Sequence, residues 1–228
     1  MTTDLGSKVH HAFIEPLLRT GRVPSGAEVA LVLGVPKETI RDALLYLGQT
    51  HGVVLHPHVC EPWIIHPFSL SPSATWVEGA ERGWWAPCMW CAFGIAALAH
   101  EPVTIHTRLG GEAEDLDIHV ENGLVRETDI LVHFALPPRA AWDNVQHFCA
   151  TVLPFSSEDR VHAWSERHGL PTGAVIPIQQ CADLGRDWYF AYAESNWRKW
   201  SVTQAADIFA GVGLTGAFWA LPPSDGRF

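Results

Sequence analysis

The chain has 228 residues, enough for one sizeable hydrophobic core or for a small domain joined to a larger one. It is 47% hydrophobic and 18% charged, which is typical of globular proteins, and its formal net charge of −10 argues against binding to nucleic acids or anionic membranes. No apolar run approaches the roughly 20 residues of a membrane span, and the first residues lack a secretion signal. Five cysteines, an odd number without disulfide-framework spacing, predict free thiols and a cytoplasmic location.

The first third of the chain predicts a small helical domain, which we assign to residues 1–66. An apolar stripe ends at Gly21, Ser25 is placed as an N-cap, and Pro36 is placed to open the next helix. Helices are expected over residues 8–20, 27–33 and 36–47, and short strands over residues 52–55 and 63–65. This order is typical of a winged-helix-like domain.

A winged helix can bind DNA, or it can serve as a docking or dimerising module. The third predicted helix offers Lys37 and Arg41 as its bases, and Glu38 and Asp42 balance them. Such a helix has a poor electrostatic footprint for a DNA duplex. We therefore favour the docking or dimerising module over nucleic-acid binding.

The rest of the chain predicts a linker over residues 67–81 and a larger domain of mixed sheet and helices over residues 82–228, giving an α+β fold. Gly110 and Gly111 separate two alternating segments that predict a hairpin, and Ser157 and Thr203 are placed to cap helices. Strands are expected over residues 103–109, 116–120, 130–136 and 174–178, and helices over residues 141–148, 157–168, 182–194 and 203–212.

The stretch from residue 83 to 100, GWWAPCMWCAFGIAALAH, joins two cysteines and three tryptophans to an uncharged apolar tail. Pro87 is placed to be the first residue of a helix, where its missing N–H costs nothing. Cys88 and Cys91 would then share one helix face near the positive end of the helix dipole, which favours thiolates. These residues predict a nucleophilic or soft-metal-binding sulfur at the mouth of an apolar site.

Each of these residues also has a plainer interpretation. A free cysteine is most often a small buried hydrophobe, and the spacing of Cys88 and Cys91 also occurs in redox motifs, although no thioredoxin-like pattern surrounds it. Cys60 and Cys181 are interpreted as structural. A metal site is conceivable at the wing, but a solvated loop is favoured there; its residues would be His56, His58 and Cys60. Aromatic residues that could wall a pocket, or simply pack, include Trp84, Trp85 and Trp90. Those that could pack, form a lid or form a dimer face are Trp188, Tyr189, Tyr192, Trp197 and Trp200.

Two stretches taken together resemble the alkylmercury (organomercurial) lyase family. The first is WCAFG at residues 90–94, followed by an apolar helix, and the second is HFCATVLPFSS at residues 147–157, followed by a helix that ends at residues 168–170. The similarity continues through AVIP at residues 174–177 and through Leu184-Gly185. It covers roughly residues 8–190, including the N-terminal helices, and the tail from residue 196 to 228 extends beyond the shorter members.

The resemblance implies protonolysis of a carbon–mercury bond, with two thiolates binding the mercury while a proton releases the hydrocarbon. Thiolate is the fitting ligand for a soft metal. Cys91 and Cys149 stand at the positions of the family's two catalytic cysteines and would hold mercury as substrate and product. The substrate would be a small apolar organometallic or thiol-reactive compound, with Cys88, Trp90 and Trp85 as its candidate contacts. No organic cofactor is implied, and external thiols would remove the product ion.

The chain departs from the family at Gly94, where the resemblance places an aspartate that carries the proton. Glycine has no side chain to carry one. Another acid could substitute, with candidates Glu112, Glu114, Asp115 and Asp117, or the Cys88 thiol could supply the proton. Alternatively the protein is a non-catalytic or repurposed soft-metal- or electrophile-binding protein on the same scaffold. A ligand-responsive transcription regulator is a third, less favoured hypothesis.

Overall fold

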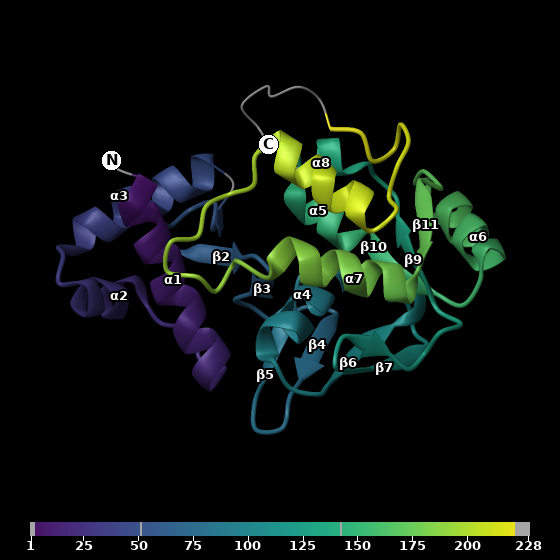
Figure 1. Ribbon diagram of the computed structural model, residues 1–228, viewed down its shortest axis with the longest axis horizontal. Coiled ribbons are helices and arrows are strands. Elements are labelled where there is room, and N and C mark those ends of the chain that lie inside the picture. Colours follow the sequence, from purple (N-terminus) through teal and green to yellow (C-terminus); the bar gives the residue numbers. More distant parts are fainter. Residues whose placement is uncertain (1–2, 51, 142, 222–228) are drawn as a thin grey trace.

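The structure is a computed structural model that describes residues 3–50, 52–141 and 143–221 (Figure 1). Its helices are α1 (Thr3–Thr20), α2 (Gly26–Leu33), α3 (Lys37–Gln49), α4 (Met89–Ala99), α5 (Val145–Ala150), α6 (Glu158–His168), α7 (Ile178–Tyr189) and α8 (Val202–Gly211), with short 3-10 turns at Leu109–Gly111 and Pro138–Ala140. Its strands are β1 (Val54–Leu55), β2 (Pro62–Ile65), β3 (Phe68–Ser69), β4 (Thr75–Glu78), β5 (Gly83–Ala86), β6 (Val103–Arg108), β7 (Asp115–Glu121), β8 (Leu124–Val125), β9 (Leu131–Phe134), β10 (Val152–Phe155) and β11 (Ala174–Pro177). The predicted α+β class is confirmed.

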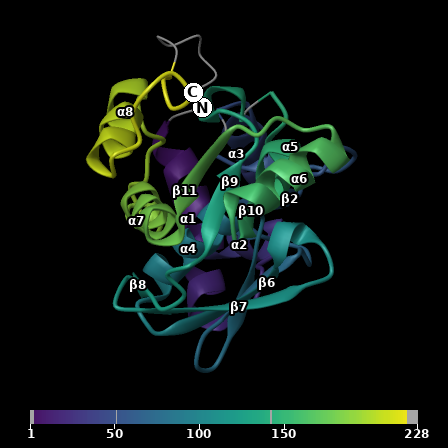
Figure 2. The same cartoon turned by 90° about the vertical axis from the view of Figure 1, so that its right-hand side faces the viewer.

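The strands form two antiparallel sheets. The larger sheet has eight strands in the order β1-β2-β3-β5-β4-β6-β7-β8, and the smaller one has the order β10-β9-β11. The central helix α4 packs on α7 and contacts β4 and β5 of the larger sheet and β10 of the smaller one. Figure 2 shows α7 and α8 side by side at one flank of the molecule. The start of α4 therefore lies deep in the interior.

The N-terminal helices form where their capping residues predict them. Ser25 accepts the Glu28 N–H while the Glu28 carboxylate accepts the Ser25 N–H, which is a complete capping box, and Gly34 ends α2 with φ 65°. β1 and β2 form the short antiparallel pair expected after α3. The winged-helix assignment of this region stays a prediction.

The segment expected to be a linker, residues 67–81, contributes β3 and β4 to the larger sheet. A single hydrophobic core also runs from Val9 in α1 to Trp219 after α8. A division of the chain into residues 1–66 and 82–228 stays a prediction, and the two parts share the sheet and the core.

Five helix starts differ from the expected ones. α1 begins at Thr3, five residues before the expected start, and α5 begins at Val145, four residues after it, with Asn144 as the N-cap. α4 begins at Met89, not Pro87, because Cys88 is the extended N-cap residue and its sulfur accepts the Cys91 N–H. α8 is capped by Ser201, not Thr203, through a capping box with Gln204. α7 begins at Ile178, four residues before the expected start, because β11 passes directly into it after Pro177. No helix among the described residues is both long and apolar enough to cross a membrane.

Candidate active site: a buried cluster of thiols

The first turn of α4 places two sulfurs next to each other. Cys88 has extended backbone angles (φ −162°, ψ 176°), and its Sγ lies 3.4 Å from the Cys91 backbone nitrogen that donates to it. A sulfur thus performs the N-cap role that a serine oxygen usually has. Cys88 and Cys91 are 3% and 1% exposed. The backbone of the helix start therefore fixes the position of one thiol relative to the other.

Two further elements bring Cys149 and His66 to this pair. Cys149 lies in α5, whose N-cap Asn144 accepts the His147 N–H at 3.0 Å. His66 lies between β2 and β3, and its Nε2 is 3.9 Å from the Cys149 Sγ. The ligand atoms of His66, Cys91 and Cys149 all lie within 4.8 Å of one another, the spacing of a metal-binding trio.

The pKa values of the three thiols shift in different directions, downward at Cys88 and upward at Cys91 and Cys149. Burial disfavours the Cys88 thiolate, but side-chain hydrogen bonds from Cys149 and Cys91 and the Cys91 N–H outweigh it, so the pKa of Cys88 lies well below its usual value. Burial and the neighbouring sulfurs raise the pKa of Cys91 well above its usual value. The hydrogen bond to Cys88 likewise raises the pKa of Cys149. Hydrogen bonding among the sulfurs therefore favours thiolate at Cys88 and thiol at Cys91, whereas the helix start was expected to favour thiolate at both.

The imidazole of His66 is neutral at physiological pH. Burial lowers its pKa to about 4, although the nearby Cys88 raises it in part. A neutral imidazole has one nitrogen that can accept a proton or bind a metal. His66 therefore adds a base or a ligand to the thiols without adding a charge.

The ring of Tyr189 occupies the space that a side chain at position 94 would need. A Cβ built on Gly94 would lie inside the van der Waals radius of the ring carbons of Tyr189. The Tyr189 hydroxyl lies 3.3 Å from the Cys91 Sγ, and burial raises the pKa of the phenol well above its usual value. A neutral hydroxyl group therefore contacts the sulfur of Cys91, and its ring lies beside Gly94.

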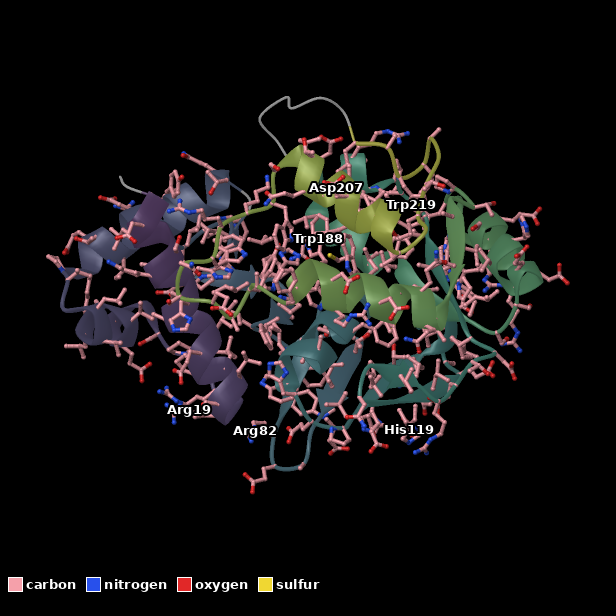
Figure 3. The ribbon with its side chains drawn as sticks, viewed as in Figure 1. Arg19, Arg82, His119, Trp188, Asp207 and Trp219 are labelled. Atoms are coloured by element: carbon pink, nitrogen blue, oxygen red, sulfur yellow. The ribbon has the colours of Figure 1, made fainter. Side chains whose placement is uncertain are left out.

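The thiols face a small cavity with aromatic walls, about 40 Å³ in volume. Trp90 is part of its wall, as predicted, and its indole nitrogen is buried with no hydrogen-bond partner among the described residues. Figure 3 shows Trp188, another wall residue, in the interior near α7. Trp85 is not brought to the cavity: it packs on Trp76 with ring centroids 4.6 Å apart. The remaining wall residues include Pro138, Ala141, Val145, Phe148, Tyr189 and Tyr192.

The carboxylates of the β6–β7 hairpin are paired at the surface. Glu112 contacts Arg167 and His168, and Glu114 lies 2.6 Å from Arg160. Asp115 pairs with Arg108, and Asp117 with His106. All four side chains are substantially exposed, whereas the thiols are buried. The structure therefore gives none of these acids a contact with the cluster.

The other cysteines lie apart from the cluster. All five cysteines are free thiols; Cys181 is fully buried in α7, and the Cys60 Sγ lies 3.5 Å from the Arg41 carbonyl oxygen. Among the described residues, His56, His58 and Cys60 do not form a metal-binding trio.

The sequence alone assigns no role to two of the site residues, His66 and Tyr189. His66 stands at the boundary of the expected linker, and Tyr189 belongs to the aromatic residues whose favoured interpretation is packing. Both reach the cluster through tertiary contacts across 83 and 98 residues of sequence, which no local pattern reports.

The α+β fold thus buries three free thiols and an imidazole beside an aromatic cavity. The sequence model of the family "Alkylmercury lyase" (MerB) matches residues 68–190, and the chain belongs to that family.

A solved structure described as the mercury-bound form of MerB2 has a similar fold. It superposes with a TM-score of 0.68 at 17% sequence identity, and the match covers 84% of this chain and 93% of that one. A search of curated proteins gave no match.

Proposed function

We propose that the protein cleaves the carbon–mercury bond of small organomercurials by protonolysis, with Cys91 and Cys149 as the catalytic residues. The observation that carries the proposal is the cluster itself: both thiols lie within 4.8 Å of each other and of His66 in a chain of the alkylmercury lyase family. Paired sulfurs are the ligands that a soft metal prefers. The mercury-bound form of the similar structure supports the same ligand.

The two thiols can supply the proton that the reaction consumes. In the first step, one thiol replaces the original ligand of the organomercurial, forms a sulfur–mercury bond and releases its proton with that ligand. In the second step, the other thiol forms its own sulfur–mercury bond while its proton passes to carbon, so the carbon–mercury bond breaks and the hydrocarbon leaves. The mercuric ion remains on two thiolates, and no redox change occurs. External thiols then take up the ion, and no organic cofactor takes part.

This stoichiometry suits a site without the family's aspartate. At rest, Cys91 and Cys149 hold their protons because their pKa values are raised. The Tyr189 hydroxyl lies 3.3 Å from the Cys91 sulfur and the His66 Nε2 lies 3.9 Å from the Cys149 sulfur, so both side chains are placed to orient the two thiols by hydrogen bonding. The proton at carbon therefore does not require a carboxylate at position 94.

The test is hydrocarbon release from methylmercury and phenylmercury with excess thiol, followed by headspace gas chromatography. We expect multiple turnovers for the wild type and a loss of at least about 100-fold in Cys91→Ser and in Cys149→Ser, because each variant lacks one sulfur–mercury bond. Cys60→Ser, on a half-exposed thiol outside the cluster, is the matched control.

Two outcomes would contradict the proposal. Stoichiometric mercury binding without hydrocarbon would identify a soft-metal-binding protein on the family scaffold. Unchanged activity in both variants would show that the cleavage site lies elsewhere.

A further inference from the structure

Cys88 lines two separate spaces. It lines the aromatic inner cavity together with Cys91 and Cys149, and it also lines a second space, a groove of about 440 Å³. Cys149 lines both as well, whereas Cys91 lines the inner cavity and not the groove. Two cysteines are therefore shared by the two spaces.

The two spaces differ in chemical character. Tryptophan, tyrosine and phenylalanine rings wall the inner cavity, which suits a hydrocarbon group. The groove presents the polar residues Ser71, Ser73, Gln146, Glu112 and His168 among apolar ones that include Trp63, Leu153 and Trp164, and its volume is that of a small-molecule pocket. A hydrophilic thiol of small-peptide size fits the groove better than it fits the cavity.

The three cysteines beside the two spaces are all almost fully buried. Cys91 is 1% exposed, Cys88 is 3% and Cys149 is 4% exposed. The Cys91 N–H donates to the Cys88 Sγ at 3.4 Å, and Cys88 lines the inner cavity beside Cys91 and Cys149, so its sulfur is placed to approach a metal ion held by those two. A thiol approaching along the groove meets Cys88 and Cys149 before Cys91.

We propose that Cys88 is a third mercury ligand and the exit ligand, which receives the ion from Cys91 and passes it to a hydrophilic thiol bound in the outer groove. This inference rests on the proposed function, because the ion it concerns is the mercuric product of that reaction. Mercury moves by ligand exchange: Cys88 binds as a third sulfur, Cys91 leaves, and two incoming thiols replace Cys88 and Cys149. The two incoming thiols bring two protons, which return to Cys91 and Cys149, and Cys88 leaves as the thiolate it was before it bound, so charge and protons balance and no electron is transferred.

The test bypasses carbon–mercury cleavage. The protein is loaded with one equivalent of mercuric chloride, mixed with excess glutathione, and the transfer of mercury is followed by its content in the protein fraction after rapid gel filtration. We expect Cys88→Ser to transfer mercury at least about tenfold more slowly than the wild type, and Cys60→Ser to transfer it at the wild-type rate. Transfer at the wild-type rate by Cys88→Ser would overturn the proposal.

A second readout reports coordination directly. X-ray absorption at the mercury edge should count three sulfur neighbours in the loaded wild type and two in Cys88→Ser. Two sulfurs in both proteins would also overturn the proposal. Because loading uses the free ion, a protein that transfers mercury through Cys88 but releases no hydrocarbon would contradict the proposed function and leave this inference standing.

A third variant tests the groove without removing a sulfur. Ala150 is exposed at the end of α5 and lines the groove, so Ala150→Trp narrows it. Ala80→Trp, at a site in the β4–β5 turn outside the groove, is the matched control. We expect Ala150→Trp to slow transfer to glutathione more than transfer to 2-mercaptoethanol, which is smaller. If Ala150→Trp slows transfer to glutathione no more than it slows transfer to 2-mercaptoethanol, and no more than Ala80→Trp does, mercury leaves by another path.

Discussion

At the scale of single residues, the most informative position is Gly94, which has no side chain. Gly94 in α4 and Gly185 in α7 let the two helices approach closely, since a Cβ on Gly185 would meet the Phe93 Cβ at 2.6 Å and the Gly94 nitrogen at 2.9 Å. The ring of Tyr189 fills the space beside Gly94 and brings its hydroxyl to Cys91. The glycine at position 94 and the position of the Tyr189 ring therefore depend on each other.

This coupling predicts the effect of Gly94→Ala. Alanine favours a helix by about 1 kcal/mol over glycine, but the clash with Tyr189 should reverse the sign and destabilise the protein by about 1–3 kcal/mol. In a Tyr189→Ala background the same substitution should cost little, because the ring is gone. Urea unfolding of the four proteins of this cycle measures the coupling.

Gly211 provides the control for helix propensity. It lies at the end of α8, and a Cβ added to it would meet no neighbouring side chain within 4 Å among the described residues. Gly211→Ala should therefore be neutral or stabilising by up to about 1 kcal/mol. Additive effects of the substitutions at positions 94 and 189 would show that the ring and the glycine are independent.

At the scale of elements, capping and turn residues predicted most helices, whereas the short strands depend on the strands with which they pair. The caps at Ser25 and Ser157 and the glycine after α6 are local signals, and the structure confirms all three. Strands of two to four residues carry too little pattern to be predicted alone, so β3, β4, β5, β8 and β10 are set by their neighbours in the sheets.

The candidate site divides in the same way. Motifs in the sequence identified Cys88, Cys91, Cys149 and Trp90, because these lie in contiguous stretches. Trp85 shares its stretch with Cys88 but β5 pairs it with β4, so its ring packs on Trp76 instead. Alternation along a strand sends neighbours to opposite faces, which a contiguous motif does not reveal.

The elements around the cavity also predict a preference among substrates. Helices α4, α5 and α7 leave about 40 Å³ in front of the thiols, close to the space of a single small group. A methyl group fits this space without rearrangement, whereas a phenyl ring must displace wall side chains at a cost of about 1–3 kcal/mol. For each substrate we define the enhancement as kcat/KM of the enzyme divided by the second-order rate constant for cleavage by a small thiol without the enzyme. We expect the enhancement for methylmercury to exceed that for phenylmercury by about tenfold or more.

Enlarging the cavity by shortening a wall side chain tests this limit on the size of the substrate's organic group. Val145 is half-buried in the wall, and Val145→Ala should raise the phenylmercury ratio relative to the methylmercury ratio. A matched change at Val175, a half-buried residue of β11 outside the wall, should leave the preference unchanged. Equal ratios for both substrates in the wild type would show that the cavity opens without cost.

At the scale of the whole molecule, the last third of the chain returns to the first helix. After α7 the chain runs alongside α1 before it turns into α8 (Figure 1). The Ser7 hydroxyl donates to the Trp197 carbonyl at 2.6 Å, and the His11 Nδ1 lies 2.9 Å from the Ala193 carbonyl. Because Tyr189 and Tyr192 precede this contact and line the cavity, docking of the segment onto α1 supports one wall of the site.

His10 makes this contact sensitive to acid. Its ring stacks on Trp197 with centroids 3.9 Å apart, is fully buried, and finds no hydrogen-bond partner among the described residues. Burial, with the nearby His11 and His66, lowers the pKa of His10 to about 3 from an ordinary value near 6.5. Tyr192 meets the imidazole edge-on, and no counter-charge among the described residues opposes the shift.

The sign of the pH effect follows from this shift. The unfolded chain takes up a proton on His10 as the pH falls below about 6.5, while the folded protein does not until about 3, so stability is complete above the first value and falls between the two. Each unit is worth about 1.4 kcal/mol, so His10 alone should lower the free energy of unfolding by about 2–3 kcal/mol at about pH 4.5. His10→Phe keeps a stacking ring without a proton site and should remove this loss.

Urea unfolding of wild type and His10→Phe at about pH 7 and about pH 4.5 measures the difference. His66, whose pKa is lowered to about 4, destabilises both proteins in acid. The diagnostic quantity is therefore the gap, meaning the difference in the free energy of unfolding between the two proteins, and how it changes with pH. The gap should widen toward acid pH in favour of His10→Phe. A gap that stays constant would mean that His10 is hydrated or protonated in the folded protein, and that α1 and the segment before α8 are less closely packed than their contacts indicate.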